Sequence, residues 1–200
     1  MEYDHVVLAA GRSSRMGFPK GLLRTPAGEN FILTRSRRNR TCGARRTFLV
    51  LGFHSEKTME QIKPLPGYIK VVINENPELG QTGSFKTVLQ KKDYSSPVMM
   101  EPVDLPPLPE KTYREYLGRC RREEINIPVY EDRWGHPPLF PGWFLEEVEE
   151  MPIDRGINSL YKKHGDRIVE IPVDDERILL DLDRPEDYEN YLNNFPGAGR

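Results

Sequence analysis

The 200-residue sequence has no apolar run that approaches the roughly 20 residues of a membrane-spanning helix, so we expect no membrane partner. It has little excess of either charge: the net charge of −2 argues against nucleic acid as the main partner. It has only two cysteines, Cys42 and Cys120, which match no metal-binding spacing. Its start, MEYDHVV, lacks the basic segment and the apolar stretch of a secretory signal. These absences predict a cytoplasmic protein with reduced, structural cysteines.

Two common phosphate-binding motifs are also missing: the G-x-x-x-x-G-K-[ST] of P-loops and the G-x-G-x-x-G of dinucleotide folds. In their place, the first apolar run leads into the loop of VVLAAGRSSRMGFPKGLL (6–23). A strand-to-helix loop with a glycine for close backbone approach and serines for hydrogen bonds suits an anionic phosphate. Arg15 can hold a phosphate through two parallel hydrogen bonds, and Lys20 supplies a point charge. The loop therefore predicts phosphate binding; a solvated basic turn is the alternative.

Short apolar runs alternate with amphipathic segments along the chain. We expect strands over residues 5–10, 47–52, 69–74, 97–103, 168–173 and 177–182. We expect helices over residues 30–43, 55–62, 84–92, 110–123 and 184–195. This alternation predicts one α/β domain, residues 1–200, with a mainly parallel sheet that binds ligands beyond the carboxyl ends of its strands. The segment from Ile125 to Ile153 is the least regular and is expected to form an insertion over the site.

Three aspartates are candidate metal ligands. Asp104 follows an apolar strand, where its carboxylate would point into the cleft as a hard oxygen ligand for Mg²⁺. Asp181 and Asp183 alternate with leucines, so an extended segment places both carboxylates on one face. One of them can join Asp104 on the same metal; Asp183, nearest the following helix start, is favoured and Asp181 stays open. For each aspartate taken alone, a turn or a helix cap is the alternative.

The stretch LAAGRSSRMGFPKGLL (8–23) resembles the signature L-A-A-G-x-S-x-R-M-G-x-P-K-x-L-L of MobA-like nucleotidyltransferases, in particular their molybdenum-cofactor cytidylyltransferase branch. The similarity continues in family order through NENPELGQTGSFKTVL (74–89), PVDLPPL (102–108), RWGHPPLFP (133–141) and LLDLDRPEDYENY (179–191). The resemblance implies a three-layer α/β/α nucleotidyltransferase fold, Rossmann-like and of the glycosyltransferase-A type. It also implies Mg²⁺- or Mn²⁺-dependent transfer of a nucleoside monophosphate, from CTP rather than GTP, to the phosphate of molybdopterin, with release of pyrophosphate.

The resemblance assigns roles to residues at the matching positions. Arg15, Lys20 and Asp104 are the expected catalytic residues, and Asp104 with Asp183 or Asp181 would bind the metal. The opening loop and the loop GQTGSF (80–85) are expected to contact the nucleotide through Ala9, Ala10, Gly11, Arg12, Ser13, Ser14, Gly80, Gly83 and Ser84. His136 and Asn158 are expected to contact the acceptor, since they lie in the region, 133–159, that departs most from the family pattern. A plain helix cap at 80–85 and a structural role for His136 are the alternatives.

Two other functions stay open. One is nucleotidyl transfer to a sugar phosphate or an alcohol phosphate. The other is a non-catalytic carrier that delivers the molybdenum cofactor to a recipient molybdoenzyme, against which the presence of Lys20 and Asp104 counts. Six arginines between residues 35 and 46 predict a solvated helix face, with a docking face for an acidic partner or an anionic cofactor as the alternative. Glu101 stands at a strand position expected to be apolar.

Overall fold

The computed structural model describes residues 1–91 and 95–196. Its strands are β1 (Tyr3–Ala9), β2 (Ala44–Leu51), β3 (Ile69–Ile73), β4 (Val98–Pro102), β5 (Ile125–Tyr130), β6 (Arg133–Trp134), β7 (Leu139–Phe140) and β8 (Ile168–Pro172). Within the described ranges they form one eight-stranded sheet in the order β3-β2-β1-β4-β7-β5-β6, with β8 paired to β5. Strands β1 to β4 are mutually parallel, as are β5 and β8, whereas β6 and β7 run antiparallel to their neighbours. The sheet is therefore mainly parallel, as predicted.

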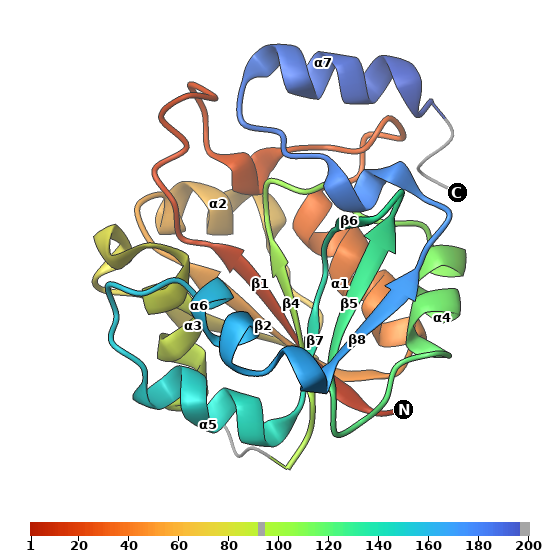
Figure 1. Ribbon diagram of the computed structural model, residues 1–200. Coiled ribbons are helices and arrows are strands. Elements are labelled where there is room, and N and C mark those ends of the chain that lie inside the picture. Colours follow the sequence, from red (N-terminus) through yellow and green to blue (C-terminus); the bar gives the residue numbers. More distant parts are fainter. Residues whose placement is uncertain (92–94, 197–200) are drawn as a thin grey trace.

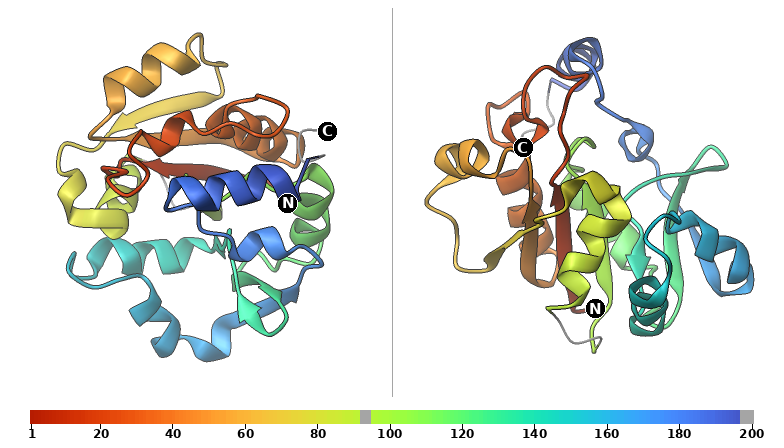
Figure 2. Two further views of the ribbon diagram at one scale, coloured as in Figure 1. Left: turned by 90° about the horizontal axis from the view of Figure 1, so that it is seen from above. Right: turned by 90° about the vertical axis from the view of Figure 1, so that its left-hand side faces the viewer.

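Helices cover both faces of this sheet (Figure 1 and Figure 2). One face carries α1 (Phe31–Thr41), α2 (Ser55–Ile62) and α4 (Glu110–Leu117). The other carries α3 (Gly80–Leu89), α5 (Gly142–Glu150) and α6 (Asn158–Lys163). The last helix, α7 (Pro185–Asn194), lies beyond the end of the sheet toward which β1 and β4 point (Figure 1). Short 3₁₀ helices occupy Lys20–Leu22, Pro77–Leu79, Gly165–Arg167 and Glu176–Leu179. The predicted three-layer α/β/α architecture is confirmed.

The alternation of side chains along β1 divides the core into two layers. Val6 and Leu8 are buried in the cluster that contains Phe85 of α3, while Val7 is buried in the cluster that contains Ile32 of α1. Successive side chains of a strand point to opposite faces, so a strand covered on both faces must be apolar at consecutive positions. This explains the apolar run at the start of the sequence.

Helix α1 begins where Asn30 caps it: the side-chain oxygen of Asn30 accepts the N–H groups of Ile32, at 2.9 Å, and Leu33. The prediction of a solvated arginine face on this helix was wrong for two residues. Arg35 and Arg38 are 0% and 3% exposed, because both point toward the segment that follows β4 and donate hydrogen bonds to its carbonyls. Arg37 and Arg40 lie on the exposed side of the same helix.

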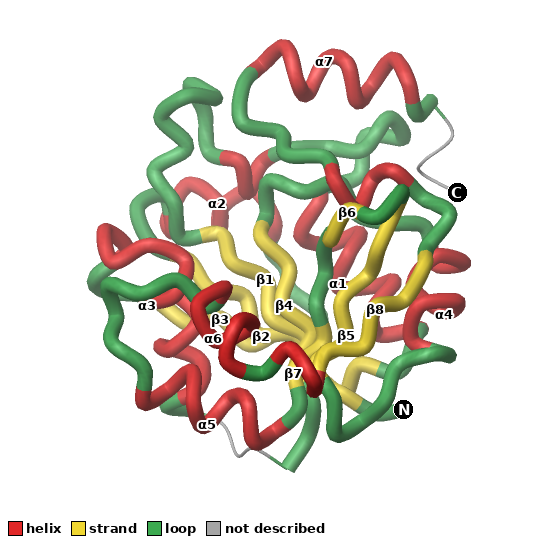
Figure 3. The backbone as a smooth tube through the Cα atoms, in the orientation of Figure 1, coloured by secondary structure: helices red, strands yellow, loops and turns green. Residues whose placement is uncertain are grey.

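Two predictions about the second half of the chain were also wrong (Figure 3). Residues 177–182 form no strand; they begin in the 3₁₀ helix Glu176–Leu179, since the side chain of Asp175 caps the N–H of Arg177. The segment 125–153 is no insertion over the site. It supplies β5, β6 and β7 to the sheet and then α5, and the pairing of β7 with both β4 and β5 joins the two halves of the sheet.

Smaller differences concern the ends of the helices. Helix α3 begins four residues before the predicted start at Ser84, and Lys92, at the predicted end, lies outside the described residues. Helix α4 stops at Leu117, followed by Gly118 as its C-cap. No helix in the described part of the chain combines the length and the apolar character needed to cross a bilayer.

The two cysteines are partly buried thiols. Both are free, and neither is fully exposed. Burial raises the pKa of Cys42 to about 11 and that of Cys120 to about 12, so both thiols are protonated at neutral pH.

Candidate functional site

A pocket of about 270 Å³ opens at the carboxyl ends of β1 and β4. The two strands are neighbours in the sheet, but the chain after β1 leads to β2 on one side and the chain after β4 leads to the opposite side. Such a reversal leaves a crevice between the two outgoing loops, which is the usual ligand site of parallel sheets. Its lining comprises Leu8, Ala9, Ala10, Gly11, Arg12, Ser13, Ser14, Arg15, Lys20, Pro77, Gly80, Gln81, Ser84, Pro102, Val103, Asp104 and Asp183.

The loop after β1 is held in a tight turn by Ser13. Ser13 has a φ of 53°, in the left-handed region, and its carbonyl accepts the N–H groups of Met16 and Gly17, each at 3.2 Å. Its hydroxyl accepts the backbone N–H of Lys20 at 3.0 Å. The turn thus returns the chain toward the pocket and presents the Lys20 side chain to it.

Lys20 lies between two carboxylates from distant parts of the chain. Its Nζ donates to Asp183 Oδ1 at 2.5 Å and to Asp104 Oδ2 at 3.2 Å. Arg15, whose side chain is 65% exposed, contacts the other oxygen of Asp183 at 2.5 Å. Burial alone would lower the pKa of Lys20, but Asp104 and Asp183 outweigh it and raise this pKa above its usual value. The site therefore keeps a largely buried cation in the lining of the pocket at neutral pH.

The three aspartates predicted to bind metal lie together. One carboxylate oxygen from each of Asp104, Asp181 and Asp183 falls within 4.8 Å of the others. The backbone N–H of Leu182 donates to the carbonyl of Asp104 at 2.9 Å, which joins the segment of Asp181 and Asp183 to the loop after β4. The hydrogen bond from Lys20 holds the pKa of Asp183 below its ordinary value, whereas burial, with the charges of Asp104 and Asp183, raises the pKa of Asp181. Three hard oxygen donors at this spacing can hold a divalent cation.

The start of α3 forms another wall of the pocket. Gly80, Gln81 and Ser84 line it, and the Ser84 hydroxyl donates to the carbonyl of Gly80 at 2.9 Å. Gly83 does not line the pocket. A Cβ at this position would lie 2.7 Å from the Cβ of Leu79, so a glycine is needed there for packing. Gln81 was not predicted from the sequence, although it stands inside the GQTGSF motif between the predicted residues Gly80 and Gly83.

His136 and Asn158 lie in two further hollows beside the first pocket. One, of about 470 Å³, is lined by both residues together with Trp134, Tyr161 and Lys162. The other, of about 360 Å³, is also lined by both, and it shares Gly80 and Gln81 with the pocket at the strand ends. The three hollows are thus neighbours, since each shares lining residues with the next. Trp134, Tyr161 and Lys162 were not predicted: Trp134 stands inside the quoted stretch RWGHPPLFP, whereas no motif marks Tyr161 or Lys162.

The turn that presents His136 is closely packed. A Cβ on Gly135 would lie 2.6 Å from the side chain of Ile178, and the backbone N–H of His136 donates to the Ile178 carbonyl at 2.9 Å. Burial lowers the pKa of His136, so the ring is neutral at neutral pH. Its Nδ1 is buried and has no hydrogen-bond partner among the described residues. A ligand in the adjoining hollow could supply that partner.

The chain resembles known proteins both in sequence and in structure. A family model described as the MobA-like NTP transferase domain matches residues 5–168. A protein named probable molybdenum cofactor guanylyltransferase, from Rhodopirellula baltica, is 34% identical over 105 residues. That match covers 52% of this chain and 48% of the relative, so the chain spans about half the length of the curated relative that it matches.

Solved structures match over almost the full length. The crystal structure of Rv0371c from Mycobacterium tuberculosis H37Rv has a TM-score of 0.81 and 25% identity, covering 96% of this chain and 99% of that one. A structure of Rv0371C described as a complex with manganese has a TM-score of 0.77 and 24% identity over 96% and 99% of the two chains. A nucleotidyl transferase from Methanothermobacter thermautotroptrophicus has a TM-score of 0.80 and 19% identity, over 98% and 97%. The expected α/β nucleotidyltransferase fold is confirmed, and because the family model matches most of its length, the chain belongs to the MobA-like NTP transferase family.

Proposed function

We propose that this chain transfers a nucleoside monophosphate from an NTP to a phosphorylated acceptor and releases pyrophosphate. The observation that carries the proposal is the arrangement of Lys20 between Asp104 and Asp183 in the lining of a pocket walled by the loop 9–15. Nucleotidyl transfer asks a protein mainly to position the reactants and to neutralise charge at phosphorus. The pocket supplies both through backbone amides, two cations and a group of carboxylates.

The chain's own residues divide this work. The backbone N–H groups from Gly11 to Ser14 would bind the β- and γ-phosphates, as amides of a strand-to-helix loop do elsewhere. Lys20 would neutralise charge on the triphosphate as the acceptor oxygen attacks the α-phosphorus and the pyrophosphate oxygen leaves. The exposed side chain of Arg15 can turn from Asp183 to the phosphates and hold them through its planar guanidinium. No nucleophilic side chain is required.

A divalent metal fits the carboxylate group. Its three oxygens lie within 4.8 Å of one another and are the hard donors that Mg²⁺ and Mn²⁺ prefer. We assign the metal to Asp104 and Asp183, since both line the pocket whereas Asp181 is exposed beside it. The bound ion supplies positive charge at the α-phosphate and so reduces its repulsion of an anionic acceptor. The description of the similar structure of Rv0371C as a complex with manganese supports a divalent metal in this proposal, but not the choice of ligands.

For the acceptor we propose the phosphate of molybdopterin. The name of the relative from Rhodopirellula baltica refers to the molybdenum cofactor, which supports this choice. The hollow around Trp134 and Tyr161 offers aromatic rings to a flat ring system, and the neighbouring hollow leads back to Gly80 beside the nucleotide pocket. The motif of the opening loop favours CTP as the donor, whereas the relative's name favours GTP. We retain CTP as the proposed donor and test it against GTP. We place the reaction, and a recipient molybdoenzyme, in the cytoplasm.

The test is a pyrophosphate-release assay with CTP, GTP, ATP and UTP against molybdopterin and a panel of sugar phosphates and alcohol phosphates. We expect release only when a divalent metal and an acceptor are both present. Lys20→Ala and Asp104→Ala should lower turnover at least ~100-fold, the scale of losing one oriented electrostatic stabiliser. Lys57→Ala, which changes an exposed lysine of α2, is the matched control.

The outcomes are distinct. Turnover with a sugar phosphate and none with molybdopterin would contradict the proposed acceptor but support nucleotidyl transfer. Tight, stoichiometric binding of molybdopterin with no pyrophosphate would identify a carrier and contradict the enzyme. Near-normal turnover in both variants would show that the reaction occurs at another site.

A further inference from the structure

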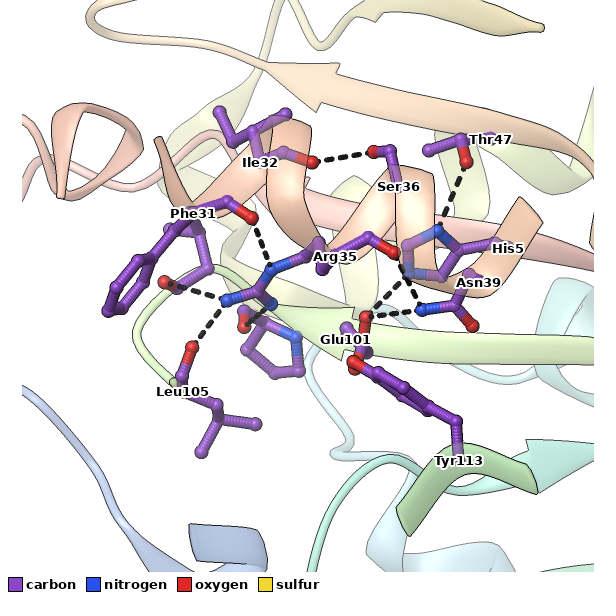
Figure 4. Close-up of polar contacts among 12 residues, drawn as sticks. His5, Phe31, Ile32, Arg35, Ser36, Asn39, Thr47, Glu101, Leu105 and Tyr113 are labelled. Carbon is purple, nitrogen blue, oxygen red and sulfur yellow. Dashed lines mark hydrogen bonds and ion pairs between the residues drawn. The ribbon is translucent and has the colours of Figure 1, made fainter. Parts of the chain in front are cut away.

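A buried arginine of α1, Arg35, donates hydrogen bonds to the loop that carries Asp104 (Figure 4). Arg35 is 0% exposed. Its Nη1 donates to the carbonyl of Pro102 at 2.7 Å, and its Nη2 donates to the carbonyls of Val103, at 3.4 Å, and Leu105. Its Nε donates to the carbonyl of Phe31 within its own helix at 3.3 Å. One guanidinium therefore binds carbonyls of residues before and after Asp104.

These carbonyls lie at the end of β4 and just beyond it; that of Pro102 also accepts the N–H of Leu105, at 3.4 Å. A buried carbonyl that lacks a hydrogen bond costs about 1–3 kcal/mol. A guanidinium offers five N–H donors in one rigid plane and stays charged at any pH of interest, so it can bind several carbonyls in a fixed arrangement. A lysine at this position would offer a single mobile point charge. The geometry therefore specifies arginine rather than any cation.

The charge of Arg35 is balanced by Glu101 on β4, three residues before Asp104. Glu101 is 3% exposed and accepts hydrogen bonds from His5 at 2.6 Å, from Asn39 at 3.3 Å and from the Tyr113 hydroxyl. Burial alone would raise the pKa of Glu101, but the hydrogen bond and charge of His5, with Arg35 and Tyr113, outweigh it and lower this pKa. The carboxylate is thus ionised at neutral pH, and the buried arginine does not stand as an uncompensated charge.

The amide of Asn39 connects the two charged groups. Its Nδ2 donates both to the backbone carbonyl of Arg35, at 3.0 Å, and to Glu101 Oε2. Helix α1, strand β4 and the loop of Asp104 are in this way joined by one polar network, drawn in Figure 4. Glu101, at a strand position that was expected to be apolar, is therefore part of the network that holds the loop of the candidate metal site.

The backbone around Asp104 is fixed on its other sides as well. The N–H of Val103 donates to the carbonyl of Leu8 on β1 at 2.9 Å, and the carbonyl of Asp104 accepts from Leu182. The Arg35 contacts complete this support from the α1 face. Groups that orient a metal ligand typically change metal affinity by about 10–100-fold when they are lost.

We propose that Arg35 is a positioning residue for Asp104: it holds the backbone of residues 102–105 so that the Asp104 carboxylate faces Lys20 and Asp183. The inference rests on the proposed function, in which Asp104 binds the metal. Arg35 is buried outside the pocket lining, so it acts on the metal and the nucleotide only through the loop.

The experiment compares Arg35→Met with Arg38→Met. Arg38 is a matched control because it lies one turn along α1, is 3% exposed, and donates to the carbonyls of Pro107 and Leu108, farther along the same segment. Mn²⁺ affinity is measured by electron paramagnetic resonance, and kcat and the KM for the NTP by pyrophosphate release. In Arg35→Met we expect Mn²⁺ affinity to fall about 10–100-fold and kcat to fall with it. In Arg38→Met we expect Mn²⁺ affinity within about threefold of wild type, at a comparable loss of thermal stability.

Arg35→Lys keeps the charge and the stem but not the planar fork, so it should resemble Arg35→Met in Mn²⁺ affinity. If Arg35→Met does not fold, Arg35→Lys is compared with Arg38→Met in its place. Hydrogen exchange of the backbone amides of residues 103–105 is measured in the same proteins, because it reports the loop without a metal. Faster exchange there is expected in the Arg35 variants and not in Arg38→Met.

Two failures can be told apart. Equal Mn²⁺ affinity in the Arg35 and Arg38 variants would overturn the role of Arg35. A wild-type chain that binds no Mn²⁺ and releases no pyrophosphate, with the exchange difference still present, would contradict the proposed function instead.

Discussion

Replacing Glu101 by methionine should destabilise the fold by about 3–5 kcal/mol, the usual cost of removing one partner from a buried ionic group. The carboxylate accepts hydrogen bonds from His5, Asn39 and Tyr113. Methionine offers these three donors no carboxylate oxygen as an acceptor. It would also remove the negative charge that balances Arg35. For a chain of this length, 1 kcal/mol corresponds to about 2–4 °C in Tm, so the expected drop is roughly 6–20 °C.

The assay is urea unfolding followed by circular dichroism, with thermal melting as the second measurement. Glu101→Gln keeps the shape and part of the hydrogen bonding, so it should cost about 1–3 kcal/mol. The control is Glu110→Gln, which removes an exposed pair with Arg114, 2.7 Å long, and should cost about 0.5 kcal/mol or less. If Glu101→Met unfolds at the same urea concentration as wild type, the network does not stabilise the fold and the reasoning fails.

The contribution of Glu101 should also depend on pH. Its pKa in the folded chain is lower than its ordinary value of 4.5. A carboxyl with a lowered pKa contributes stability that is fully present above its unfolded value and is lost as the pH falls through its folded value. The difference in unfolding free energy between wild type and Glu101→Gln should therefore be constant near neutral pH and shrink below about pH 4.5. A difference that stays constant down to pH 3 would contradict an ionised Glu101.

Three further predictions concern the site. Changing His136 or Asn158 to Ala should raise the KM for the acceptor and leave the KM for the NTP within a few-fold, as measured by pyrophosphate release. A selective loss of NTP affinity would show that the acceptor end and the nucleotide end of the site are assigned the wrong way round. Asp183→Asn should weaken Mn²⁺ binding at least ~10-fold in a resonance titration, and Asp181→Asn should weaken it far less; the opposite ranking would assign the metal to Asp181. Chelation with EDTA should abolish turnover, and added Mg²⁺ or Mn²⁺ should restore it; turnover that survives chelation would exclude the metal.

Much of the lining of the pocket at the strand ends could be predicted, because each of its loops carries a signal that is local in sequence. A loop such as that of Gly11 to Lys20 has a recognisable composition, and Asp104 directly follows an apolar strand. Parallel strands place their carboxyl ends at one edge of the sheet, which is enough to bring such loops together. The contact of Lys20 with Asp104 follows from that arrangement. Asp183 follows no strand of the described sheet, and its segment meets the loop of Asp104 through the hydrogen bond from the Leu182 N–H to the Asp104 carbonyl.

The buried network could not be predicted, because its partners come from four distant segments. Glu101 meets His5 from β1, Asn39 from α1 and Tyr113 from α4 only in the folded chain. A charged residue taken alone is almost always solvated, so Arg35 was expected on a helix surface. The strands β6 and β7 could not be predicted either, because each has only two residues and two residues show no measurable periodicity.

The central claim, nucleotidyl transfer, is tested most directly by following the α-phosphate of the donor. The chain is incubated with NTP labelled at the α-phosphorus, Mg²⁺ and molybdopterin, and the products are separated by chromatography. The account predicts that the label moves to the acceptor in a phosphoanhydride product, in amounts equal to the pyrophosphate released. Label that stays in the NTP, or that appears only as free nucleoside monophosphate while the acceptor is unchanged, would contradict it.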